Sequence, residues 1–158
     1  MPYVELHARS AFSFLRGGSA PEVLGTTAGE AGLGATAVCD RNGLYGAVRF
    51  HASALAAGTR PIVGCELLME DDSVVPVLVG SRRGYQRLCR LLTTVHLRSA
   101  KGEGRVRWEE LARDTDGLFA LTGDEDGPVR RAWSQRGATA GDEAGRRLLG
   151  AFGPERLF

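Results

Sequence analysis

The chain has 158 residues, of which 43% are hydrophobic and 25% are charged, and its formal net charge is +1. This length and composition predict one globular domain with a substantial core. The near-neutral charge excludes a polybasic nucleic-acid binder as a whole-molecule class. No apolar run approaches the roughly 20 residues that a membrane-spanning helix requires, so we expect no membrane partner.

Strands and helices alternate along the chain. The hydrophobic patterns predict strands at residues 4–7, 35–40, 60–69, 73–80 and 117–123. Helices are expected from an N-cap at Ser19 to about residue 31, and at 44–57, 85–97, 108–114, 128–135 and 138–153. Connections of helical length between strands predict an α/β fold with mostly parallel strands. Residues 155–158 are expected to begin a further strand, which indicates a truncated domain whose open sheet edge favours self-association.

Three polar residues stand at or near the ends of predicted buried strands: His7, Asp40 and Glu66. In parallel α/β folds this edge of the sheet holds ligands and metal ions. A histidine with two carboxylates can bind a divalent metal, or supply a base and its orienting partner. The alternative is that each side chain is a strand-end polar group satisfied by loop amides.

The three cysteines, Cys39, Cys65 and Cys89, are widely spaced and odd in number. This pattern predicts reduced thiols in a cytoplasmic protein, not a disulfide framework.

A basic stretch covers residues 82–107, and Arg83, Arg87 and Arg90 share one face of a predicted helix. This face is a candidate contact for DNA phosphates or for a partner protein. A solvated face or pairing with the acidic segment that follows, at residues 109–126, are the alternatives.

Several stretches resemble the N-terminal PHP domain (polymerase and histidinol phosphatase) of bacterial DNA polymerase III alpha subunits. They are ELHARSAFSFLRGGSAPEVL, AVCDRNGLYGAVRF and RPIVGCEL, followed in order by GYQRLCRLLT, GLFALTG and FGPERLF. SAFSFL and GLYGAVRF are most similar to the error-prone branch. The resemblance implies a distorted (β/α)7 barrel, of which residues 1–158 are a single PHP domain fragment from the N-terminal part. The rest of the barrel and the polymerase domains are expected in a longer parent chain.

The resemblance also implies which residues once bound metal. His7 matches the first histidine of the family's His-x-His, Asp40 matches the acid after the second strand, and Glu66 matches the glutamate of the third strand. The family's last ligands lie beyond Phe158.

Other ligand positions have changed. Arg9 stands at the second histidine of His-x-His, Arg16 at an aspartate position, and Arg41 at the histidine that follows Asp40. A further histidine position corresponds to about Val74. We interpret His7, Asp40 and Glu66 as vestigial metal positions, with Arg9, Arg16 and Arg41 as charge surrogates that hold the acids in place of ions. The alternative is an eroded site whose arginines point to solvent.

The functional expectation is a non-catalytic scaffold within an error-prone DNA polymerase that serves replication and repair synthesis. Its expected partners are the parent's polymerase domains, with DNA and accessory proteins as further candidates. No cofactor is expected here, although the ancestral site would hold zinc or manganese and the parent polymerase would use magnesium. The alternative is a metal-dependent phosphoesterase or 3′–5′ exonuclease, in which metal-activated water attacks phosphorus.

Overall fold

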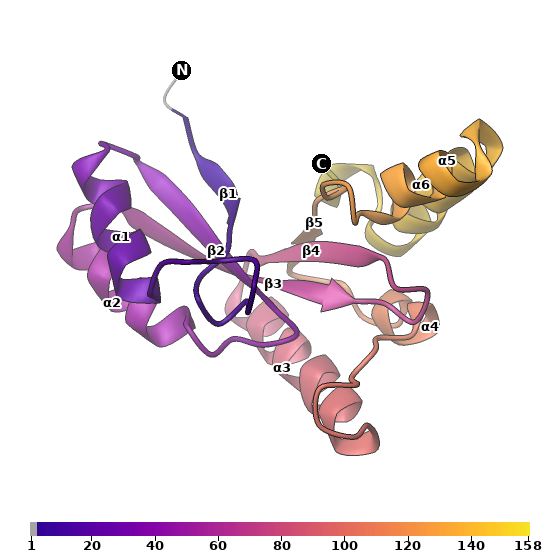
Figure 1. Ribbon diagram of the computed structural model, residues 1–158, viewed down its shortest axis with the longest axis horizontal. Helices are drawn as coiled ribbons and strands as arrows, with labels where there is room; N and C mark the ends of the chain where they lie inside the picture. Colours follow the sequence, from indigo (N-terminus) through magenta and orange to yellow (C-terminus); the bar gives the residue numbers. More distant parts are fainter. Residues whose placement is uncertain (1–2) are drawn as a thin grey trace. The chain divides into compact units, whose positions relative to one another are not determined.

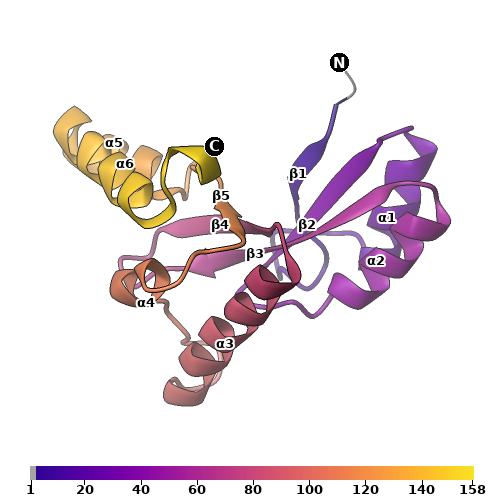
Figure 2. The same cartoon turned by 180° about the vertical axis from the view of Figure 1, so that it is seen from behind.

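The computed structural model describes residues 3–158, and the chain divides into two compact units, one ending at Glu66 and one beginning at Leu67. Figures 1 and 2 show the elements of each unit from two sides. The single domain expected over residues 1–158 stays a prediction.

The first unit is a parallel sheet with two helices. Its elements are β1 (Glu5–Ala8), α1 (Pro21–Glu30), β2 (Ala35–Arg41), α2 (Ala47–Ala56) and β3 (Arg60–Leu68), which continues into the second unit. β2 pairs in parallel with β1 and with β3, which confirms the α/β fold class and parallel pairing for this unit. Six consecutive residues of β2, from Ala35 to Asp40, are buried, as expected for a strand covered on both faces.

Two helix starts differ from the prediction. α1 begins at Pro21 with Ala20 as its N-cap, and no side chain caps it, so the predicted Ser19 cap is wrong. α2 begins at Ala47, because the residues before it form a turn in which Asn42 adopts a φ of 47°.

The second unit contains β4 (Val74–Val79), α3 (Arg82–Arg98), α4 (Trp108–Ala112), β5 (Leu118–Ala120), α5 (Pro128–Arg136), α6 (Ala138–Phe152) and the 3-10 helix η1 (Pro154–Arg156). β4 and β5 pair antiparallel, so parallel pairing does not extend through this unit. The strand expected at residues 155–158 is reduced to η1 and one parallel bridge between Leu157 and Ala120.

Two further expectations can be compared with the structure. Among the described residues no helix is both long and apolar enough to cross a bilayer. Cys39, Cys65 and Cys89 are free thiols, and burial raises the pKa of Cys39 well above its usual value. A buried thiol of this kind stays protonated and is a poor nucleophile.

α1 and α2 lie side by side (Figure 1), and glycine in α1 permits their close approach. A Cβ at Gly25 would lie 2.1 Å from Ser53 Oγ and 2.7 Å from the Ala54 nitrogen. The close approach lets Phe50 and Ala54 of α2 pack with Val38 of β2 in the core.

We expect Gly25→Ala to lower the free energy of unfolding by about 2 kcal/mol, because α2 must shift to admit the methyl group. Urea unfolding measures the change. Gly150→Ala is the matched control, since no atom lies within 4 Å of the Cβ position in that helical residue. The control should gain up to about 1 kcal/mol from helix propensity alone. Equal effects of the two substitutions would contradict the packing argument.

Candidate functional site

The three predicted site residues lie on adjacent parallel strands of the first unit. His7 is in β1, Asp40 in β2 and Glu66 in β3. The register pairs Arg41 of β2 with Glu66 of β3, so these two residues are neighbours across the strands. Successive side chains of a strand point to opposite faces. Asp40 precedes Arg41 in β2. The side chain of Asp40 therefore points to the opposite face of the sheet from the side chain of Arg41.

Glu66 is fully buried and is the centre of a cationic cluster, which consists of Glu66, His7, Arg9 and Arg41. His7 Nε2 lies 2.7 Å from Oε1, and Arg9 Nε donates to the same oxygen at 2.5 Å. Arg41 Nε donates to Oε2 at 3.1 Å. Because a carboxylate only accepts hydrogen bonds, Nε2 of His7 carries the proton in this pair. Both oxygens of Glu66 thus accept hydrogen bonds. The donors are His7 in β1, Arg9 directly after β1, and Arg41 in β2.

Burial raises the pKa of Glu66, but the hydrogen bond from His7 and the charges of Arg9 and Arg41 lower it by more. The net pKa of Glu66 lies below its usual value, so the side chain is an anion at neutral pH. Two guanidinium groups, whose protons are not lost in proteins, lie beside this charge.

Asp40 has different partners. Its Oδ1 accepts the Ser10 N–H at 2.9 Å and the Ser13 hydroxyl at 2.7 Å, while Oδ2 accepts the Ser10 hydroxyl at 2.7 Å. Asp40 and both serines are buried. Asp40 therefore anchors the turn that follows β1. This role is close to the alternative in which a strand-end polar group is satisfied by its loop.

Ser10 and Ser13 were not among the site residues predicted from the sequence. The available signal was two small hydroxyl residues, three positions apart, directly after the first strand. Arg16, on the same turn, has an exposed side chain, and the surrogate role expected for it stays a prediction. Val74, which stands at about a further histidine position of the family, is buried in β4.

In the second unit, the arginines of α3 face an acidic segment. Arg87 Nε lies 2.5 Å from Asp114 Oδ2, and its NH1 lies 2.6 Å from Asp116 Oδ2. Arg83 Nε lies 3.9 Å from the same Asp116 oxygen. The hydrogen bond from Arg87 and its charge lower the pKa of Asp116. This pairing is the intramolecular alternative to a phosphate contact, and the DNA or partner contact expected for Arg83, Arg87 and Arg90 stays a prediction.

Comparison with known proteins decides the family. The PHP domain family matches residues 5–158, nearly the whole chain. The chain belongs to the PHP domain family.

The curated relatives of this PHP domain are polymerases. It is 40% identical over 167 residues to the error-prone DNA polymerase of Mycobacterium tuberculosis, covering 98% of this chain and 15% of that protein. It is 36% identical over 174 residues to the error-prone DNA polymerase of Symbiobacterium thermophilum, covering 100% of this chain and 16% of that protein. The chain thus spans roughly a sixth of the length of these relatives. These similarities confirm the resemblance on which the sequence analysis relied.

One solved structure with a similar chain comes from Bifidobacterium adolescentis and is described as a metal-dependent phosphoesterase. It is 19% identical, with a TM-score of 0.48, and the match covers 94% of this chain and 50% of that chain.

In this PHP domain the hydrogen bonds at His7, Asp40 and Glu66 compete with a divalent metal ion for the same ligand atoms. Zinc and manganese bind through carboxylate lone pairs and the unprotonated nitrogen of histidine. Both Glu66 oxygens and Nε2 of His7 are already used in hydrogen bonds, and both Asp40 oxygens accept from the turn. Two guanidinium groups beside Glu66 would also repel a cation.

Proposed function

We propose that this PHP domain is a non-catalytic scaffold within an error-prone DNA polymerase, with Arg9 and Arg41 in place of metal ions. The observation that carries the proposal is the pairing of both Glu66 oxygens with guanidinium nitrogens. A hydrolytic member of the superfamily would use such oxygens to hold the ion that activates water. Here the same lone pairs are occupied by permanent cations, which supply charge balance but no hydroxide.

The arrangement has a physical rationale. Loss of a metal from between carboxylates leaves buried negative charge, which is unfavourable without a partner. Arginine offers a fixed charge and directional donors, so it can keep the strand ends in their original geometry. Under this proposal the domain supports the polymerase domains of a longer chain. The nucleotidyl transfer takes place in those domains, with carboxylate-bound magnesium.

Metal analysis tests the proposal directly. The purified chain is incubated with excess zinc or manganese, desalted, and measured by inductively coupled plasma mass spectrometry. We expect far less than stoichiometric metal, because the carboxylate oxygens of Glu66 and Asp40 already accept hydrogen bonds. The matched variant is Arg9→His combined with Arg41→His, which restores imidazole at the two ligand positions and should increase metal retention.

Two results would contradict the scaffold. One is stoichiometric, tightly held metal in the wild-type chain. The other is hydrolysis of a phosphate ester such as p-nitrophenyl phosphate that stops when a chelator is added. Either result would favour the phosphoesterase or exonuclease alternative.

A further inference from the structure

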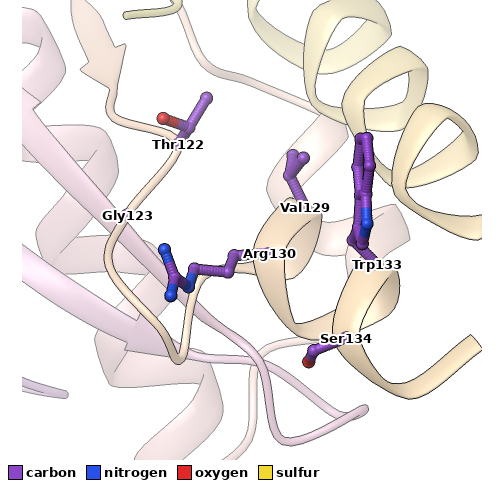
Figure 3. Close-up of a pocket in the computed structure, with 6 residues that line it drawn as sticks. All are labelled: Thr122, Gly123, Val129, Arg130, Trp133 and Ser134. Atoms are coloured by element: carbon purple, nitrogen blue, oxygen red, sulfur yellow. The ribbon is translucent and has the colours of Figure 1, made fainter. Parts of the chain in front are cut away.

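A hollow of about 530 Å³ lies in the second unit, and none of its lining residues was predicted from the sequence to belong to a site. Its walls are the loop after β5, with Thr122 and Gly123, and one face of α5, with Val129, Arg130, Trp133 and Ser134. Figure 3 shows Arg130 extending from α5 toward the Gly123 loop and Trp133 standing on the same helix beside α6. The volume lies within the range of small-molecule sites.

Trp133 is the unusual residue of this hollow. Its side chain is 58% exposed, whereas Trp108, the other tryptophan, is 3% exposed. α5 is followed by Gly137, whose φ of 87° lets the chain reverse into α6. A Cβ at Gly141 of α6 would lie 3.2 Å from Trp133 Cβ and Cε3. The missing side chain therefore lets α6 pack against the indole, which restricts its motion while much of it stays in contact with solvent.

Arg130 supplies the charge of the hollow. It is exposed and is the only charged residue among those that line the hollow. No ion pair in the described part of the chain involves Arg130. In the nearby acidic loop, Asp124 Oδ1 accepts the Asp126 N–H at 3.1 Å, and the Asp126 carbonyl accepts the N–H of Val74 in β4 at 2.9 Å.

We propose that this hollow binds a nucleobase together with its phosphate, with the base stacked on Trp133 and the phosphate paired with Arg130. An exposed indole fixed by its neighbours gives a π-face that any base can stack on, at little entropic cost. A guanidinium on the same helix face provides the directional donors that phosphate oxygens accept. Thr122 and Ser134 add hydroxyl groups to the lining of the hollow. The bound base and its phosphate belong either to single-stranded DNA or to a free nucleotide.

Tryptophan fluorescence tests the site on the 158-residue chain. Oligodeoxythymidylate or thymidine monophosphate is added at low salt, and the exposed Trp133 should be quenched while the buried Trp108 is not. Trp133→Phe should remove the quenching yet still bind a labelled oligonucleotide, as measured by anisotropy, because an aromatic face remains. Trp133→Ala should weaken that binding about tenfold. Tighter binding of the oligonucleotide than of the monophosphate identifies a strand site, and equal binding identifies a nucleotide site.

Arg130→Gln should weaken oligonucleotide binding and reduce the slope of log K against log salt by about 0.7, the value for one phosphate contact on a single strand. Arg146→Gln, an exposed arginine of α6 outside the hollow, removes the same charge and should leave both quantities unchanged. The proposal is overturned if neither ligand quenches Trp133 at low salt. It is also overturned if the two arginine variants behave alike, or if inorganic polyphosphate displaces the oligonucleotide equally well from Trp133→Ala and wild type.

This site is independent of the scaffold role, because metal content and fluorescence report on different residues. A chain that retains metal and binds nucleotides would remove the scaffold proposal alone. A chain that does neither would remove only the nucleotide site.

Discussion

Replacing Glu66 by glutamine should lower the free energy of unfolding by about 3 kcal/mol. The substitution keeps the size of the side chain but removes the charge that balances Arg9 and Arg41. One of the two oxygens also becomes an NH2 group, which faces a guanidinium donor instead of accepting from it. Glu66 is fully buried, so solvent cannot replace the lost interactions. Urea unfolding followed by circular dichroism measures the change.

The pH dependence of the free energy of unfolding, measured for wild type and for Glu66→Gln, gives a second test. The pKa of Glu66 is lowered in the folded chain from its usual value of 4.5. A lowered folded pKa contributes stability above the unfolded pKa and loses it as the pH falls through the folded value. The difference between wild type and Glu66→Gln should therefore be constant near neutral pH and shrink once the pH falls below 4.5.

Glu22→Gln is the matched control, because Glu22 is half-exposed and its carboxylate lies 3.5 Å from Arg49 Nε. Exposed pairs contribute between zero and about 1 kcal/mol. A loss of less than about 1 kcal/mol at Glu66 would mean that the arginines do not depend on the acid, and the charge-surrogate interpretation would be wrong.

The sequence predicted the elements of the first unit well because their signals are local. β2 is a continuous buried run, and the glycines and turn residues that bound it are visible in the sequence. The direction of β5 was not predictable in the same way. A buried strand such as Leu118–Ala120 has the same composition whether it runs parallel or antiparallel, and the long connection through α3 and α4 permits either.

The site was predicted in part, for a similar reason. Family positions placed Arg9, Arg16 and Arg41 near Asp40 and Glu66 together, and in the structure Arg9 and Arg41 contact Glu66. The partners of Asp40 could not be predicted, because they depend on how the turn after β1 folds back. Charge complementarity is readable from residue types, whereas the capture of a carboxylate by a backbone N–H and two hydroxyls depends on local geometry.

Asp40→Ala should also destabilise the chain by about 3 kcal/mol, for a different reason from Glu66→Gln. The substitution leaves the Ser10 N–H and the hydroxyls of Ser10 and Ser13 without their acceptor in a buried place. Buried donors without partners lose the hydrogen bonds that water gives them in the unfolded chain. Urea unfolding measures the loss. Ser13→Ala removes two hydrogen bonds, the one its hydroxyl donates to Asp40 Oδ1 and the one it accepts from the Arg41 N–H, and should lose about 2 kcal/mol.

Hydrogen exchange separates the anchoring role of Asp40 from a general loss of stability. The turn held by Asp40 presents Phe14 at 83% and Leu15 at 88% exposure, and Leu15 has a φ of 61°, a conformation that a free turn would not keep. The amide of Gly17 donates to the Ser13 carbonyl at 2.9 Å. Relative to wild type, Asp40→Ala should accelerate exchange of this amide much more than exchange of the α2 amides. Uniform acceleration across the first unit would mean that Asp40 is an ordinary core residue. Unchanged exchange would mean that the turn is held by its own backbone, since Asp40 would then contribute nothing that the Ser13 carbonyl does not already provide.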